Sequence, residues 1–175
     1  MYNMGGSIAD ALKKIQASEY VLPAIQREFV WDSEQIERLF DSLMQGYPFG
    51  TFLFWKVRPE TSGKFKFYDF VRNYHERDAA HCPDLGSLPS QALTAVLDGQ
   101  QRLTALNIGL RGSMAWKVPY KWWNNPEAFP KRILRLDLLS TGGPDEDGVR
   151  YRFKFLDDAQ VERQHSGHWL SLIHI

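Results

Sequence analysis

Apolar residues recur at helical spacing in three segments of the chain, and each segment is predicted to pack one face on a core. Ser7 and Asp10, at the start of the first segment, have the spacing of a capping box. The predicted helices run over residues 7–16, from a cap at Asp32 or Ser33 to Gly46, and from near Gln100 to Gly112. Their apolar faces consist of Ile8, Leu12 and Ile15, of Ile36, Leu39, Phe40 and Leu43, and of Leu103, Leu106 and Leu110.

Runs of β-branched and aromatic residues predict extended segments between these helices. The segment 51–57, "TFLFWKV", is so apolar that we expect both of its faces to be covered. The segment 63–71 alternates Lys and Phe and is expected to be a half-exposed strand, whereas 72–90 is polar and is expected to form a loop. Further strands or extended segments are predicted over residues 20–31, 93–97, 132–139 and 149–156.

The order of these elements predicts an α+β fold, with a mixed sheet flanked by helices and a C-terminal β-hairpin extension. The hairpin is formed by residues 132–139 and 149–156, joined by the turn-rich "STGGPDEDG". We divide the chain into a core over residues 1–112 and a β-rich extension of the same domain over residues 113–175. Because the chain stops on apolar residues, we expect it to be truncated. Its last five residues, "SLIHI" (171–175), resemble translated sequencing adapter, which leaves their origin open.

The amino-acid composition excludes several classes of protein. Hydrophobic residues make up 43% of the 175 residues and charged residues 24%, which is typical of a globular domain. Lys plus Arg equals Asp plus Glu, at 21 each, so a wholly basic nucleic-acid surface is excluded while a local basic patch is not. The single cysteine, Cys82, excludes an internal disulfide framework and favours a cytoplasmic location. No apolar run is long enough to cross a bilayer, so we expect no membrane partner.

The densest polar chemistry lies in "VLDGQQRL", where a predicted strand passes into a predicted helix. Gly99 permits a sharp turn, and the first N–H groups of the following helix favour phosphate. Arg102 can add a forked cationic contact, and Asp98 suits a metal ion or an attacking water. Gln100 and Gln101 can hold a water or read a base edge. The alternative, in which Asp98 caps the helix and pairs with Arg102, stays open.

A second polar segment, "IQREFVW", places Gln26 and Arg27 beside Phe29 and Trp31. Two Gln-Arg pairs can converge across one cleft, and aromatic rings beside an arginine suit a stacked base, although such rings are more commonly core residues. "GYPFG" (46–50) is a third candidate wall, and a tight turn after a helix also explains it.

Together, "LPAIQREFVWDSEQIERLFDSLMQGYPFGTFLFW" and "VLDGQQRLTAL" resemble the N-terminal domain of GmrSD-type modification-dependent restriction systems, over about residues 8–112. That family carries an (I/V/L)DGQQR motif and is similar in fold to the ParB and sulfiredoxin superfamily. The resemblance implies binding and hydrolysis of a nucleoside triphosphate with Mg²⁺, linked to DNA cleavage in anti-phage defence. It assigns Asp98, Gln101 and Arg102 to catalysis, Asp98 also to the metal, and Gln26, Arg27, Gly99 and Gln100 to nucleotide binding.

The implied partners are a nucleoside triphosphate, DNA through the full-length system, and an HNH-type nuclease as a C-terminal domain or a separate subunit. Nothing in this sequence matches that nuclease, and no P-loop motif occurs. His165 and His168, like His75, His81 and Cys82, lack the context of a metal site and are interpreted as loop residues. The alternative function is a nucleotide- or DNA-binding module of ParB-like fold without turnover, for which "KVPYKWWNN" and "KRILR" offer a basic, aromatic surface.

Overall fold

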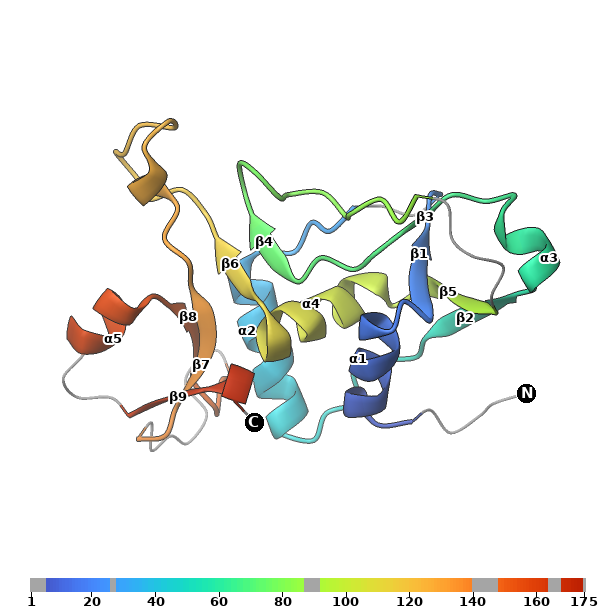
Figure 1. Cartoon of the computed structure of the whole chain (residues 1–175). Coiled ribbons are helices and arrows are strands. Elements are labelled where there is room, and N and C mark those ends of the chain that lie inside the picture. Colours follow the sequence, from blue (N-terminus) through green and yellow to red (C-terminus); the bar gives the residue numbers. More distant parts are fainter. Residues whose placement is uncertain (1–5, 26–27, 87–91, 140–147, 164–167, 175) are drawn as a thin grey trace. The chain divides into compact units, whose positions relative to one another are not determined.

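A computed structural model describes residues 6–25, 28–86, 92–139, 148–163 and 168–174 of the chain. These residues form two compact units whose segments interleave along the sequence (Figure 1). Unit 1 comprises residues 1–29, 50–71 and 81–106, and unit 2 comprises residues 30–49, 72–80 and 107–175. The predicted division into residues 1–112 and 113–175 is of a different kind, because it cuts the chain at one point whereas each unit collects several stretches of sequence. It stays a prediction.

Unit 1 is built on a four-stranded mixed sheet in the order β2-β5-β1-β3. Strand β1 is parallel to β5, whereas β2 is antiparallel to β5 and β3 is antiparallel to β1. The α+β class with a mixed sheet is therefore confirmed. The elements of this unit are α1 (Ile8–Gln16), β1 (Tyr20–Pro23), β2 (Leu53–Val57), α3 (Pro59–Ser62), β3 (Phe67–Tyr68) and β5 (Leu93–Asp98).

Helix α1 and the strand core of unit 1 follow the predicted apolar pattern. The Ser7 hydroxyl accepts from the Asp10 backbone N–H, and the Asp10 carboxylate accepts from the Ser7 N–H, which completes the predicted capping box. Leu12 and Ile15 are buried on the face of α1 toward the core. The strands bury a compact cluster: Val21, Val57, Phe67, Leu93 and Ala95.

The expectation that both faces of residues 51–57 are covered was wrong. Strand β2 lies at the edge of the sheet and pairs only with β5 among the described strands. Leu53 and Phe54 are 56% and 40% exposed, and only Val57 of this strand is fully buried. An apolar run shows that a segment is hydrophobic but not how many neighbours it has, so it does not separate a central strand from an edge strand.

Two other predictions in this part of the chain, a strand over 63–71 and a loop over 72–90, differ from the structure. The half-exposed strand predicted over 63–71 is reduced to Phe67–Tyr68. The predicted loop over 72–90 contains β4 (Asn73–His75), which pairs in parallel with β6 (Ser113–Ala115). Both strands are too short for a periodic pattern to mark them.

Helix α4 (Gln100–Arg111) begins directly after β5, as predicted, and contributes residues to both units. Leu103 and Leu106 are buried, whereas Leu110 is only partly buried. Gly109 lies against the Phe40 ring and Leu134, and a Cβ at this position would overlap the ring. The close approach of this helix to Phe40 therefore requires glycine.

Unit 2 carries the predicted C-terminal hairpin, extended by a third strand. β7 (Ile133–Asp137) pairs antiparallel with β8 (Phe153–Leu156) and also with β9 (Trp169–Ser171), so the extension is a three-stranded sheet and not a hairpin alone. Most of the predicted connecting turn falls on residues 140–147, outside the described residues. The remaining elements of unit 2 are α2 (Ser33–Met44), α5 (Asp158–Arg163) and the 3-10 turns η1 (Pro126–Ala128) and η2 (Leu172–His174).

Two buried carboxylates of α2 join this helix to the chain around β8. Asp41, 6% exposed, accepts from the backbone N–H groups of Arg150 and Tyr151 at 3.1 and 2.7 Å. Glu37 accepts from the Phe155 N–H at 3.0 Å and from Lys154 Nζ at 2.7 Å. Side-chain acceptors on the helix thus satisfy backbone donors more than a hundred residues away in sequence, at 109 and 110 positions for Asp41.

Helix α2 begins and ends as predicted, with Asp32 as its N-cap and Gly46 at φ +81° just after it. Within the described part of the chain, no helix combines the length and the apolar character needed to cross a bilayer.

We predict that Asp41→Ala destabilises the protein by about 1–3 kcal/mol, because two backbone N–H groups lose their charged acceptor in a buried place. The free energy of unfolding, from urea titration, is the measurement. Glu34→Ala on the same helix is the matched control, since Glu34 is exposed and pairs only with Arg38 in an i,i+4 ion pair, worth about 0.3–0.5 kcal/mol. Equal losses in the two variants would contradict the anchoring role of Asp41.

Candidate functional site

The predicted polar turn lies at the carboxyl end of β5, where Asp98 is the last residue of the strand and Gln100 the first of α4. Gly99 between them has φ +85°, a conformation that L side chains rarely adopt. A Cβ at Gly99 would overlap the Phe52 ring. Glycine is therefore required here for the backbone turn and also for the space that Phe52 fills.

Arg102, in the first turn of α4, is held by residues of the segment just before β2. Its Nη2 donates to the Thr51 carbonyl oxygen at 2.8 Å, and its guanidinium lies 4.9 Å from the centre of the Phe52 ring. Gly50, at φ +91°, leaves the space that Nη1 occupies. The Arg102 side chain is 20% exposed, so this cradle fixes its direction while leaving part of it accessible.

Asp98 contributes little to that cradle. Its carboxylate lies 3.5 Å from Arg102 Nη2, at the limit of a hydrogen bond, and its side chain is 66% exposed. The alternative in which Asp98 pairs with Arg102 is therefore present as a long, exposed ion pair, whereas a pair locked within the interior does not fit this geometry. The carboxylate faces solvent and can bind a ligand.

The two glutamines of the motif lie in different surroundings. Gln101 Nε2 donates to the Glu28 carbonyl oxygen at 2.8 Å, so the motif touches the segment that carries the upstream pair. Gln100 is 9% exposed and lies inside the unit. Gln26 and Arg27 fall outside the described residues, so their predicted convergence with the motif stays a prediction. Phe29 is 6% exposed and belongs to the core, the more common of the two roles considered for it.

An aromatic row, defined as Tyr20, Phe54 and Phe52, leads along the sheet to Arg102. Ring centroids are 5.0 Å apart for Tyr20 and Phe54 and 6.1 Å apart for Phe54 and Phe52. A cation stands at each end, with Lys14 Nζ 5.2 Å from the centre of Tyr20 and Arg102 over Phe52. Sequence reasoning missed this row because its rings come from β1, from β2 and from the residue just before β2, which only the folded sheet brings together. Residues 46–50 were expected to form one wall of the cleft, and of these residues Gly50 lies beside Arg102.

With this geometry in place, comparison with known proteins is informative. The family described as GmrSD restriction endonuclease, N-terminal domain, matches residues 8–167. The chain belongs to this GmrSD family. It is thus a domain of a restriction system, and the resemblance seen in the DGQQR segment is confirmed and extends well beyond residue 112.

A relative of this GmrSD domain is the uncharacterized protein MJ0686 of Methanocaldococcus jannaschii, which is 37% identical over 123 residues. The alignment covers 70% of this chain and 19% of the relative, so the chain spans about a fifth of that protein's length.

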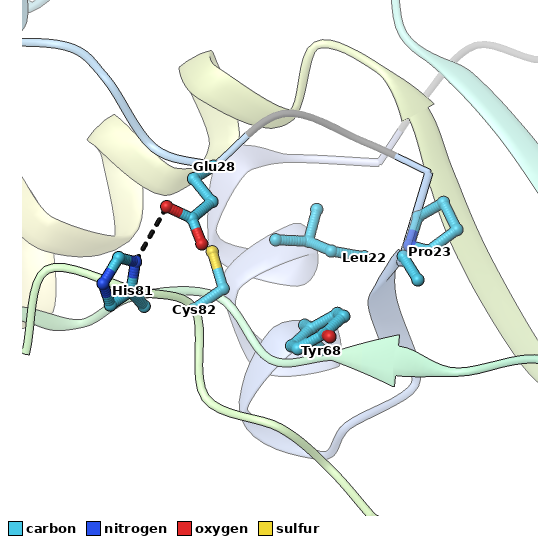
Figure 2. Close-up of a pocket in the computed structure, with 7 residues that line it drawn as sticks. Leu22, Pro23, Glu28, Tyr68, His81 and Cys82 are labelled. Atoms are coloured by element: carbon cyan, nitrogen blue, oxygen red, sulfur yellow. Dashed lines mark hydrogen bonds and ion pairs between the residues drawn. The ribbon is translucent and has the colours of Figure 1, made fainter.

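The GmrSD domain also has a cavity of about 170 Å³ beside the Glu28 segment (Figure 2). Glu28 Oε2 and His81 Nδ1 are 2.8 Å apart at its rim, and Cys82 lies next to them. The remaining lining is Leu22, Pro23, Ala24 and Tyr68. Within the described residues, no three His, Cys, Asp or Glu side chains gather where they could hold a metal ion. The interpretation of His75 as a loop residue was wrong, because it is the last residue of β4. His81, Cys82 and His168 lie outside the helices and strands, and His165 lies outside the described residues.

We predict that Cys82 reacts slowly with iodoacetamide in the folded protein. Burial raises the pKa of the Cys82 thiol above its usual range, so the reactive thiolate is scarcer at a given pH than in an exposed cysteine. The alkylation rate, measured by mass spectrometry from pH 7 to pH 10, should rise later with pH in the native protein than in the same chain unfolded in urea. Coincident pH profiles would contradict the burial of this thiol.

Proposed function

We propose that this GmrSD domain binds a nucleoside triphosphate at the turn between β5 and α4, hydrolyses it, and thereby regulates DNA cleavage. The cleavage itself is assigned to a C-terminal HNH-type nuclease domain or to a partner subunit of the restriction system. The observation that carries the proposal is the fixed, partly exposed Arg102 beside the solvent-facing carboxylate of Asp98.

Phosphate binding is supported by the way positive charge is placed at this turn. The N-terminus of α4 carries a partial positive charge that favours an anion, and Gly99, beside which the Phe52 ring lies, is assigned to nucleotide binding from the family resemblance. Arg102 donates to Thr51 through Nη2 and leans on Phe52, which reduces the side-chain entropy lost when it binds. Gln100, which is buried, is assigned to phosphate through its backbone N–H at the first position of the helix.

Asp98 fits a divalent cation bound together with a nucleotide. Mg²⁺ in nucleotide sites is commonly held by one or two carboxylates plus substrate phosphates and water, so a single exposed carboxylate at the strand end is sufficient protein ligation. When bound, the ion would neutralise charge on the phosphates. Asp98 itself lies too far from Arg102 for a short ion pair, which leaves its oxygens available to the ion.

Water positioning is assigned to Gln101. Its carboxamide is fixed by the hydrogen bond from Nε2 to the Glu28 carbonyl, and a fixed amide can orient the water that attacks the terminal phosphate. Gln26 and Arg27, two and one residues before Glu28, are assigned to the nucleotide from the family resemblance.

The base is assigned to the aromatic row, where Phe54 is the most exposed ring at 40%. Stacking on a ring accepts every base, so this assignment carries no preference for one nucleotide.

We predict that Asp98→Asn and Arg102→Lys each lower phosphate release by about 100-fold, because the first removes the carboxylate charge and the second removes the fixed guanidinium contact that the reaction needs. Lysine keeps the charge of Arg102 but cannot bind Thr51 and a phosphate with one rigid fork. Release from GTP, ATP and CTP with Mg²⁺ is the assay. Asp84→Asn, at an exposed ion pair with Lys66 in the same unit, is the control and should keep full activity.

The outcomes separate two functions. Turnover that both variants lose supports hydrolysis at this turn. Tight nucleotide binding without release by the unaltered protein supports the alternative, a binding module without turnover, and contradicts the catalytic assignment.

We also predict that Gly50→Ala weakens nucleotide binding about tenfold, the loss of about 1.4 kcal/mol expected for a misplaced charged contact. The new Cβ would overlap Arg102 Nη1 and push the guanidinium out of its cradle. Gly86→Ala is the matched control, because Gly86 also has a positive φ, +61°, but a Cβ added there would have no atom within 4 Å. Calorimetric titration measures affinity, and urea titration checks that both variants lose similar stability. Unchanged affinity in Gly50→Ala would argue against Arg102 as a phosphate ligand.

A further inference from the structure

The connection between β6 and β7 in unit 2 presents large aromatic side chains to solvent. Tyr120 is fully exposed, Trp122 is 85% exposed and Trp123 is 47% exposed. The segment extends beyond the ends of both strands (Figure 1). Large exposed rings gathered on one segment are characteristic of an interaction site, whereas single exposed apolar residues are ordinary.

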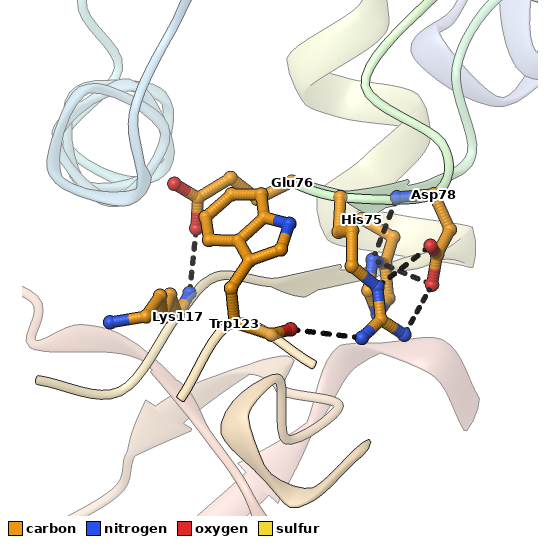
Figure 3. Close-up of polar contacts among 6 residues, drawn as sticks. His75, Glu76, Asp78, Lys117 and Trp123 are labelled. Atoms are coloured by element: carbon orange, nitrogen blue, oxygen red, sulfur yellow. Dashed lines mark hydrogen bonds and ion pairs between the residues drawn. The ribbon is translucent and has the colours of Figure 1, made fainter. Parts of the chain in front are cut away.

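We call the whole connection, residues 116–132, the tryptophan loop. The base of this loop is held by several contacts. Arg77 Nη1 donates to the Trp123 carbonyl oxygen at 3.1 Å (Figure 3). The Arg77 guanidinium lies 5.0 Å from the centre of the Phe129 ring. The Trp123 ring meets Phe129 edge-on at 5.2 Å. The Lys117 N–H donates to the Glu76 carboxylate at 2.7 Å. Trp123 therefore serves partly as an anchor, while Tyr120 and Trp122 are left outside.

Backbone strain lies at the tip of the same loop. Tyr120 has φ +66°, one of two described non-glycine residues with positive φ. A bulky residue pays roughly 1–2 kcal/mol for the left-handed conformation, and strain of this kind is retained where the surrounding structure imposes it. The loop thus holds an exposed tyrosine in a left-handed backbone conformation that tyrosine by itself disfavours.

Charge distinguishes this loop from the rest of the chain. Residues 116–132 contain four basic residues and one acidic residue, Glu127, in a protein whose charges balance overall. Arg132 is buried with its guanidinium 3.9 Å from the centre of the Trp116 ring, so it serves the interior. Lys121 forms a weak, exposed ion pair with Glu127 at 3.4 Å, and Lys117 and Lys131 are the other lysines of the loop.

We propose that the tryptophan loop binds DNA through unpaired bases, which stack on Trp122 and Tyr120 while Lys117, Lys121 and Lys131 contact the flanking phosphates. Exposed ring faces beside cations are the combination that binds single strands, because every base has a face to stack and every nucleotide carries a phosphate. An apolar protein partner would use the rings but would gain nothing from the lysines. This inference goes beyond nucleotide hydrolysis and does not depend on it.

Fluorescence anisotropy with a labelled oligonucleotide, single-stranded or annealed to its complement, tests the proposal. The protein should bind the single strand more tightly than the duplex. Trp122→Ala should weaken single-strand binding about tenfold and remove the preference, whereas Trp122→Phe, which keeps a ring, should retain most of the affinity. Phe65→Ala, at a half-exposed ring of unit 1, is the matched control and should bind normally.

The lysines are tested by the salt dependence of the same binding. Lys121→Ala should reduce the slope of log affinity against log salt by about 0.7, the value for one lost phosphate contact on a single strand. Lys64→Ala, an exposed lysine of unit 1, should leave the slope unchanged.

Three results would overturn the proposal: no binding of single-stranded DNA, equal affinity for single strand and duplex, or equal affinity of Trp122→Ala and the unaltered protein. Sedimentation velocity adds a fourth, since a dimer that dissociates in Trp122→Ala would make the loop an interface between copies of this chain. Phosphate release is measured in parallel, so that failure of DNA binding and failure of hydrolysis are told apart. The anisotropy and sedimentation results alone decide whether the loop binds DNA, whether or not any variant hydrolyses nucleotide.

Discussion

The direction of one guanidinium governs the chemistry available at the β5–α4 turn. Arg102 leaves the first turn of α4 and is captured by the Thr51 carbonyl and the Phe52 ring. The capture requires two glycines, Gly50 and Gly99, each in a positive-φ conformation and each with no side chain where another group must lie. Arg102 is thus held by a backbone carbonyl and an aromatic ring, with the Asp98 carboxylate at the limit of hydrogen-bond distance.

The same device, a polar side chain that satisfies distant backbone groups, recurs in unit 2. Glu37 and Asp41 on α2 accept from backbone N–H groups around β8. Because such carboxylates are buried, their removal leaves donors without partners, and this makes the attachment specific as well as stabilising. Arg77 does the same for the tryptophan loop by donating to the Trp123 carbonyl. In each case a charged side chain contacts the backbone of a segment that is distant in sequence.

Aromatic residues in this chain have several roles that composition does not separate. Phe67 and Phe129 are buried in cores, and Phe52 supports an arginine. Phe54 and Trp122 remain exposed on a sheet edge and on a loop. The aromatic content, 14% of the residues, thus supplies both core packing and candidate stacking surfaces.

The sequence by itself determined the three helices, the N-caps of α1 and α2, the strand at residues 93–97 and the place of the polar turn, because these depend on local periodicity and on capping and turn residues. It also identified the family through a contiguous motif. Only the tertiary structure decided that β2 is an edge strand, that β9 joins the C-terminal sheet, and that Gly50, Thr51 and Phe52 meet Arg102. Strand order and contacts between distant segments depend on how the chain folds back on itself, and no local pattern of residues encodes them.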